Sequence, residues 1–271
     1  MSGARRRAPL IGWMIACYAF LYAPIGFLVV FSFNDSRLVT EWSGFSARWY
    51  VALWHDRTLI DATWLSLRIA TVSATIACIV GAAAGLALAR FGRFRGRLLF
   101  EGALAASLVL PEVITGLSLL LLFVTLQQVV GWPAGRGAWT VTLAHASVSV
   151  AYVAVVVRAR LVDAGVTLEQ AAMDLYAPPW KAFAVITLPL MAPALVAGWL
   201  LAFTLSMDDV VVASFTSGPG ASTLPMVVFS ATRLGVTPEI YALATVIVAV
   251  VAVVLGAVAA LWRRRVGGVW T

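Results

Sequence analysis

Three of the carboxylates that stand within or beside long apolar runs of this 271-residue sequence could bind a cation. The first, Glu112, follows Pro111 at roughly 20 Å along a helix that begins near Leu98, at 1.5 Å per residue. An ionisable side chain at such a depth is costly, so it indicates a polar pathway or a buried partner. Pro111 weakens the helical hydrogen bonding beside it, as in the broken helices that line cavities. The alternative is a Glu112 that is protonated or paired with a neighbouring subunit.

The other two carboxylates, Asp208 and Asp209, are adjacent at the end of a later apolar run. Neighbouring carboxylates repel each other, so a nearby cation is favourable, and a ligand with two ammonium groups would suit the pair. An exposed acidic turn that caps the following segment is the alternative reading. The sequence therefore predicts a pathway for a cationic solute that includes Glu112, Asp208 and Asp209.

Other chemistry finds little support in the sequence. A phosphate-binding loop needs Gly-Lys-Ser or Gly-Lys-Thr, and the single lysine, Lys181, lies outside such a motif. Cys17 and Cys78 sit singly in apolar runs, without the spacing of a metal site or a disulfide. His55 and His145 are isolated, and His145 lies in an apolar run, where it either makes a helix-packing hydrogen bond or faces a pathway. No Ser-His-Asp spacing indicates a hydrolase, so we expect no catalytic residue, no metal and no cofactor.

The elements that must position these residues are membrane helices. Hydrophobic residues make up 62% of the sequence and charged residues 11%, and the mean hydropathy is +0.96, far above that of soluble domains. A bilayer core of roughly 30 Å requires about 20 apolar residues per helix. Six such runs predict an all-α, polytopic membrane protein with six transmembrane helices, at residues 10–33, 67–89, 98–130, 138–157, 182–205 and 240–261.

Basic residues predict the orientation of these spans. Arg5 to Arg7 precede the first run, which is too long for a signal-peptide core and has no small-residue cleavage site, so we expect an uncleaved anchor. With residues 1–9 in the cytoplasm, 13 of the 19 basic residues fall on the cytoplasmic side. Residues 263–271 are then also cytoplasmic, and residues 34–66 form a loop on the other side; the resemblance described below implies that this loop is periplasmic and that the membrane is a bacterial inner membrane. Because the basic residues are dispersed over four membrane-flanking clusters, the net charge of +7 indicates no nucleic-acid-binding face.

A polar segment, TLEQAAMDLYAPPWKAFAVITLP, occupies the cytoplasmic loop between the fourth and fifth runs. Thr167 and Gln170 form a capping-box pattern, which predicts a helix over 168–177 that stops before Pro178. About ten residues make roughly 15 Å of helix, too short to cross a membrane. The spacing of its apolar residues places Leu168, Ala171, Ala172 and Leu175 on one face of the helix. This face either rests on the ends of neighbouring spans or on lipid, or it docks into a cytoplasmic partner.

This segment resembles the cytoplasmic signature of permeases of ATP-binding-cassette importers: E-A-A, three residues, G, nine residues, I, one residue, L-P. The same spacing here holds Gln170-Ala171-Ala172, Tyr176, Ile186 and Leu188-Pro189. Gln170 replaces the usual Glu, for which Glu169 is a substitute, and Tyr176 replaces the usual Gly. Tyr adopts a positive φ less readily than Gly, so we expect altered backbone geometry after the helix. The resemblance implies that the helix inserts into a cleft of an ATPase subunit, through Glu169, Gln170, Ala171, Ala172, Asp174, Leu175 and Tyr176.

A second stretch, SMDDVVVASFTSGPGASTLPMVVFSATRLGVTPEIYALAT, resembles the corresponding region of polyamine importer permeases, nearest to the second permease subunit of putrescine systems. The segments FNDS and VLPEVITGLSLLLLF extend the resemblance over nearly the whole chain. It implies the type I ABC importer permease fold (MetI-like), with a five-helix core over 67–262. It also implies a homologous second permease, two ATPase chains, a periplasmic polyamine-binding protein and surrounding membrane lipid as partners, and putrescine or spermidine as substrate.

Two other classes of protein compete with this interpretation. A self-contained secondary transporter or channel for small cations would account for Glu112 and for six spans, but six spans without an inverted repeat are few for such a protein. It would also leave the cytoplasmic loop helix unexplained. A membrane enzyme would need a catalytic constellation at an interface, and the sequence shows none.

Overall fold

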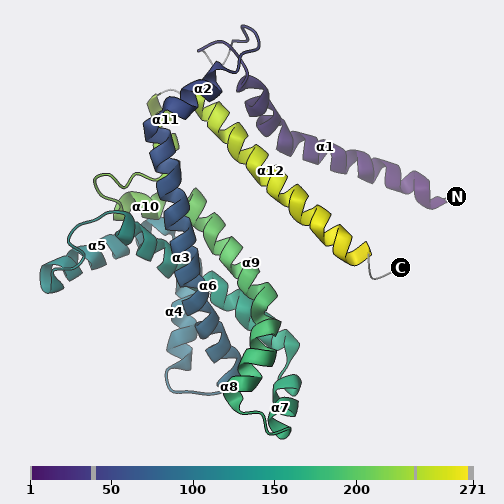
Figure 1. Ribbon diagram of the computed structural model, residues 1–271, viewed down its shortest axis with the longest axis vertical. Helices are drawn as coiled ribbons and strands as arrows, with labels where there is room; N and C mark the ends of the chain where they lie inside the picture. The colour runs from purple at the N-terminus through teal and green to yellow at the C-terminus, as the bar shows by residue number, and fades with distance from the viewer. Residues whose placement is uncertain (1, 38–40, 235–236, 268–271) are drawn as a thin grey trace. The chain divides into compact units, whose positions relative to one another are not determined.

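The computed structural model describes residues 2–37, 41–234 and 237–267, which are almost entirely α-helical (Figure 1). Among these residues the only extended pairing is an isolated bridge between Asn34 and Phe45. The chain divides into two compact units, residues 1–60 with 230–271, and residues 61–229. The all-α fold predicted from the sequence is confirmed.

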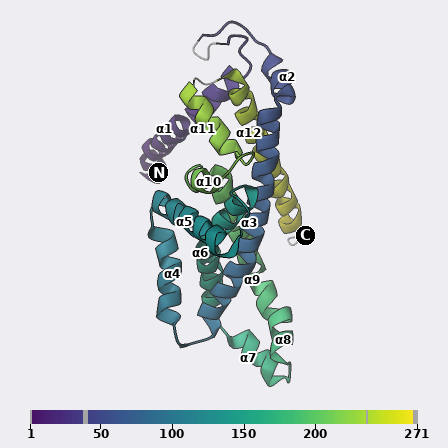
Figure 2. The ribbon, with the colours of Figure 1, turned by 90° about the vertical axis from the view of Figure 1, so that its left-hand side faces the viewer.

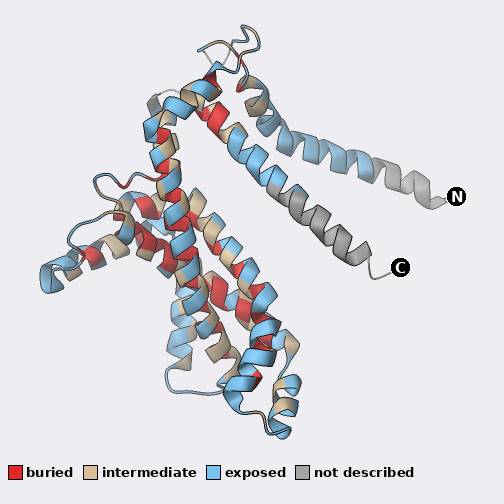
Figure 3. Cartoon of the chain, in the orientation of Figure 1, coloured by how far each residue is buried: buried red, intermediate tan, exposed pale blue. Residues whose placement is uncertain are grey.

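The unit of residues 61–229 is built around α6 (Ala138–Ala164). Two long helices pack on it, α3 (Arg57–Arg90) and α9 (Leu188–Asp208). Figure 3 shows the buried residues gathered on α6 and on the sides of its neighbours that face it. Of the five described spans, α6 is the most buried inside the protein, so it forms the centre of this unit. The shared core consists of Ala74, Ala77, Val153, Val157, Leu161, Met191, Ala194 and Ala202.

Glycines let the backbones of these helices approach closely. A Cβ at Gly85 of α3 would lie 2.7 Å from the Ala154 carbonyl oxygen of α6, and one at Gly81 would lie 2.7 Å from the Val153 Cβ. On the opposite helix, Gly198 of α9 also faces Val153. Small residues at helix contacts are typical of membrane bundles, in which close van der Waals packing drives association.

The predicted span at 98–130 is not one helix. The chain forms α4 (Arg97–Val109) and α5 (Glu112–Val130), and Leu110 between them is extended, with ψ of 136°. The residue before a proline avoids the helical region, so Pro111 ends α4 and starts α5 in a new direction. Figures 1 and 2 show α5 turning sharply away from α4. The prediction of a continuous third span was therefore wrong.

The remaining elements of this unit are short. The loop between α6 and α9 holds α7 (Thr167–Asp174) and α8 (Pro179–Ala182), and a single π-helical turn, η1 (Phe183–Thr187), leads into α9. After α9 the chain forms α10 (Val211–Thr216) and enters α11 (Leu224–Leu234). Such π-helical turns are rare in proteins, and many of those that occur lie at functional sites.

The second unit contains α1 (Ser2–Phe31), α2 (Arg48–His55) and α12 (Pro238–Gly267), and α12 packs against the other two. Its loop after α1 folds around Asn34, which is 2% exposed. The Asn34 Oδ1 accepts a hydrogen bond from the Ser43 amide at 2.9 Å, and the Trp49 indole donates to the Asn34 carbonyl at 2.7 Å. The FNDS segment is therefore the structural centre of this loop.

Five helices in the described residues are long and apolar enough to cross a membrane. They contain the apolar parts of α1, α3, α5, α6 and α9, and a shorter apolar helix, Pro238–Val253, lies within the sixth predicted span. Side chains in the later part of that span, and of residues 2–10, lie outside the described residues, as does part of the predicted tail at 263–271. The prediction of a polytopic membrane fold is confirmed by these helices.

Candidate functional site

Glu112 owes its position to the break between α4 and α5. It is the first residue of α5 and follows the extended Pro111, which has ψ of 138°. The sequence placed it in the middle of a continuous helix, whereas the structure places it at a helix N-terminus, where the backbone dipole favours a negative charge. A carboxylate is therefore less costly at this position than the sequence alone suggests.

Asp209 takes its position from the end of α9. It is extended, with φ of −70° and ψ of 125°, and its carboxylate accepts hydrogen bonds from the amides of Val212 at 3.2 Å and Ala213 at 2.7 Å. These amides belong to the first turn of α10, so Asp209 satisfies donors that have no partner within that helix. The alternative reading of an acidic cap is thus borne out for Asp209, except that its side chain is only 12% exposed.

His145 connects Asp209 to the rest of the bundle. Its Nε2 lies 2.9 Å from Asp209 Oδ2, its Nδ1 lies 2.6 Å from Ser206 Oγ, and the residue is 4% exposed. The Ser73 hydroxyl donates to Ser206 Oγ at 3.3 Å. A hydrogen-bonded chain therefore runs from α3 through α9 and α6 to the start of α10. Of the two roles considered for His145, the helix-packing hydrogen bond is confirmed, and the residue also lines a cavity.

The linked Ser206, His145 and Asp209 share the connectivity of a hydrolase triad, which no spacing in the sequence indicated. A nucleophilic serine needs an accessible hydroxyl. Ser206 is 6% exposed, and its hydroxyl is already bonded to His145 and Ser73. We therefore interpret the chain as a structural network that fixes the ends of α9 and α10.

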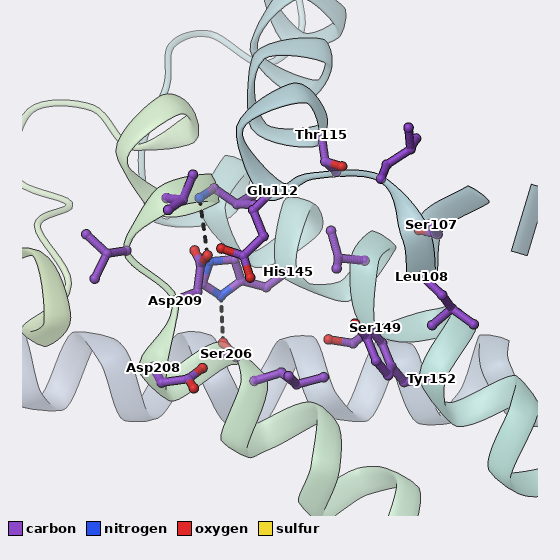
Figure 4. A pocket seen from close by; sticks show the side chains of 16 residues that line it. Ser107, Leu108, Glu112, Thr115, His145, Ser149, Tyr152, Ser206, Asp208 and Asp209 are labelled. Carbon is purple, nitrogen blue, oxygen red and sulfur yellow. Dashed lines mark hydrogen bonds and ion pairs between the residues drawn. The ribbon is translucent and has the colours of Figure 1, made fainter. Parts of the chain in front are cut away.

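One cavity of about 420 Å³ lies beside this network and is lined by all three predicted carboxylates (Figure 4). Among the described residues, Glu112 and Asp208 form no ion pair, whereas Asp209 is bonded to His145. The cavity thus offers two carboxylates without a cationic partner, and such an arrangement favours a cation. The wall comes from α4, α5, α6, α9 and α10 and consists of Ser107, Leu108, Leu110, Glu112, Thr115, His145, Val148, Ser149, Tyr152, Leu205, Ser206, Asp208, Asp209, Val210, Val211 and Val212.

The predicted loop helix is present as α7 and begins one residue early. Its N-cap is Val166, whose carbonyl accepts the Gln170 amide at 3.0 Å, and no side chain caps it. The capping box of Thr167 and Gln170 was therefore wrong, because Thr167 is itself the first helical residue.

The α7 helix ends at Asp174, three residues before the predicted end at residue 177. Tyr176 has a φ of +62°, the left-handed conformation that a glycine would favour. The Tyr176 amide bonds to the Met173 carbonyl at 2.9 Å, and the Ala177 amide bonds to the Ala172 carbonyl at 3.0 Å. This is the Schellman pattern, which satisfies the last helical carbonyls. The altered backbone expected from the tyrosine is thus not seen, since these bonds offset its strain and the ring is 95% exposed.

The two faces of α7 differ from those predicted. Leu168 is 57% exposed and Leu175 is 82% exposed, so this part of the predicted apolar face is open. Glu169 and Ala172, three residues apart, are half-buried and face the spans. Glu169 forms an ion pair of 2.9 Å with Arg90 of α3. The outward face carries the other predicted docking residues, which are Gln170, Ala171, Asp174, Leu175 and Tyr176.

Comparison with known proteins places this architecture among transport proteins. Residues 80–268 match the family model described as the binding-protein-dependent transport system inner membrane component. The chain is 57% identical to the putrescine transport system permease protein PotI of Escherichia coli over 237 residues, 88% of this chain and 84% of that protein. It is 41% identical to the spermidine/putrescine transport system permease protein PotC of the same organism, over 87% of each chain.

Solved structures share the fold at low sequence identity. A bacterial ABC transporter involved in the import of the acidic polysaccharide alginate matches with a TM-score of 0.70 at 16% identity, over 94% of this chain and 95% of that one. An amino acid ABC transporter matches with a TM-score of 0.56 at 19% identity, over 80% of this chain and 98% of that one.

Proposed function

Because the chain belongs to the family of binding-protein-dependent transport system inner membrane components, we propose that it is the permease subunit of an ATP-driven importer of polyamines. The similarity to putrescine and spermidine/putrescine permeases over most of the chain supports putrescine, or spermidine, as the substrate. Family membership also favours this function over a self-contained cation transporter or channel. ATP would be hydrolysed by a separate subunit, since this sequence has no phosphate-binding loop.

The cavity beside α9 is the observation that carries the choice of substrate. A fold shared with an importer of an acidic polysaccharide does not determine the charge of the solute, so the argument must come from the site. Here Glu112 and Asp208 line the same cavity without a cationic partner among the described residues. A diammonium ion neutralises both, and its apolar methylene chain suits the leucines and valines of the wall.

The mechanism assigns one role to each part. A periplasmic binding protein delivers the diamine, and a homologous second permease completes the pathway. Two ATPase chains bind the exposed face of α7 and its counterpart, and closure of the ATPase dimer draws the two loop helices together. The spans then change from outward-facing to inward-facing. In this orientation both termini and α7 lie in the cytoplasm, in agreement with the basic residues that flank the spans.

Uptake in reconstituted vesicles tests this function. The chain, its second permease and the ATPase are purified together and reconstituted, with ATP on the side of the ATPase and the binding protein in excess on the other. We expect labelled putrescine to accumulate only when ATP and the binding protein are both present. Uptake by this chain alone, or ATP-dependent uptake of neutral solutes and not of diamines, would contradict the proposal.

A further inference from the structure

The guanidinium group of Arg90, the last residue of α3, makes a dense set of bonds to two other elements, α7 and the end of α6. Its Nε lies 2.9 Å from Oε2 of Glu169, and its Nη2 lies 3.0 Å from Oε1 of the same carboxylate. The other hydrogen bonds reach the end of α6, at the Leu161 carbonyl (3.0 Å) and the Gly165 carbonyl (2.8 Å). The two charged side chains are only 12% and 15% exposed. Bidentate pairs of this kind are among the strongest hydrogen bonds in proteins.

Glu169 extends the connection to the fifth span. Its Oε1 accepts a hydrogen bond from the Thr187 hydroxyl at 3.0 Å, and Thr187 is the buried last residue of η1. One carboxylate of α7 therefore contacts α3 directly, α6 through Arg90, and the entry to α9. The 21 residues of α9 span roughly 30 Å at 1.5 Å per residue and end at Asp208, in the wall of the cavity.

We propose that Arg90 and Glu169 are positioning residues that make α7 move as one body with the cytoplasmic ends of α3, α6 and α9, and so transmit the motion of the ATPase to the cavity. This inference rests on the proposed function. An eight-residue helix is marginally stable by itself. Without a fixed attachment, α7 would move independently of the spans. The ion pair supplies that attachment on the inward face and leaves the outward face open. Packed, hydrogen-bonded elements of this kind can carry coupling between distant sites.

A purely structural role makes a different prediction from a positioning role. Removing one partner of a buried pair leaves an unpaired charge, which destabilises the protein, whereas removing both charges relieves that penalty. If the ion pair has only a structural role, neutralising both residues should restore both stability and transport. If the pair transmits motion, neutralising both residues should restore stability but not transport, because α7 still lacks its attachment to the spans.

The test compares Glu169→Gln, Arg90→Gln and the double variant in the purified, reconstituted complex. Three quantities are measured: the amount of ATPase that co-purifies, the unfolding temperature, and the amount of solute taken up per ATP hydrolysed. Arg93→Gln is the matched control, since Arg93 is an exposed arginine just after α3 with no ion pair among the described residues. We expect both single variants to unfold at lower temperature and the double variant to recover most of that loss. Uptake per ATP should fall at least three-fold in all three variants and stay unchanged in the control.

Three results would overturn the proposal. These are unchanged uptake per ATP in the single variants, recovery of uptake per ATP together with stability in the double variant, and loss of ATPase co-purification in all three variants. The last two would mean that the pair only maintains the fold of α7. Failure of the unmodified complex to transport diamines would instead contradict the proposed function, and the ratio could still be measured with whichever solute it carries.

Discussion

The imidazole of His145 lies 2.9 Å from the carboxylate of Asp209, although the two residues are 64 positions apart in the sequence. The same carboxylate caps the first turn of α10, and the same imidazole reaches Ser206 of α9. Asp209 is therefore engaged on both sides by the protein itself. The neighbouring Asp208 forms no ion pair among the described residues.

Replacing Asp209 should mainly affect stability. Asp209→Asn removes the charge that His145 and two amides of α10 face, and hydrogen bonds to a charged group are worth about 1.5 to 3 kcal/mol. We expect the unfolding temperature of the purified complex to fall by about 5 °C. His145→Ala in the same chain should add little, because both changes remove the same bond. Undiminished stability with lost uptake would show that Asp209 binds the solute.

Replacing Glu112 or Asp208 should mainly affect transport. Glu112→Gln and Asp208→Asn nearly preserve shape but remove one charge-assisted contact to an amine, so we expect the apparent affinity for a diamine to fall by about 10-fold. Stability and basal ATP hydrolysis should stay near those of the unmodified protein. Uptake of labelled putrescine at a series of concentrations measures the effect. Unchanged uptake in both variants would place selectivity in the second permease or the binding protein.

Most of the helices were predictable because spanning a bilayer requires a long apolar run. The runs at 67–89, 138–157 and 182–205 all lie within single long helical segments of the structure, α3, α6 and the stretch from α8 to α9. The break at Pro111 was missed because hydropathy does not register backbone direction, and the apolar run continues on both sides of it. A proline within a long apolar run was the available signal, and its effect was underestimated.

The site was predictable only in part, because its connections are tertiary. Glu112, Asp208 and Asp209 were found as charges in apolar surroundings, and the structure brings them around one cavity. The connection of Asp209 to His145 depends on how α6 packs, which no local pattern encodes. Arg90 is one of the 13 basic residues that the predicted orientation places on the cytoplasmic side, and nothing in the sequence indicates its bonds to Glu169.

The loop helix allows a matched pair of substitutions. Ala171 is exposed on the outward face of α7, while Ala172 is half-buried beside Glu169 on the inward face. Ala171→Arg should block docking sterically, so co-purification of the ATPase should fall several-fold while the unfolding temperature of the chain is kept. Ala172→Arg should lower the unfolding temperature, because a long charged side chain must displace α7 from the spans. Equal co-purification with Ala171→Arg and with the unmodified chain would indicate that α7 does not dock an ATPase.

The α3 helix, which carries Arg90, packs closely against α6, which carries His145, and Gly85 is one of the glycines that allow this contact. A Cβ at Gly85 would lie 2.7 Å from the Ala154 carbonyl oxygen and 3.1 Å from the Arg158 amide nitrogen. Both are backbone atoms, so no side-chain rotation can relieve the clash. Gly85→Ala must therefore separate the helices, and overpacking of this kind costs about 1 to 3 kcal/mol.

Gly102→Ala on α4 is the matched control, since a Cβ there meets nothing within 4 Å and alanine favours the helix by about 0.5 to 1 kcal/mol. We expect Gly85→Ala to unfold at lower temperature than the unmodified chain, and Gly102→Ala at the same or higher temperature. Since the displaced α3 carries Arg90, uptake per ATP should also fall in Gly85→Ala alone. Equal unfolding temperatures for the two variants would mean that α3 and α6 do not approach as closely as the structure shows.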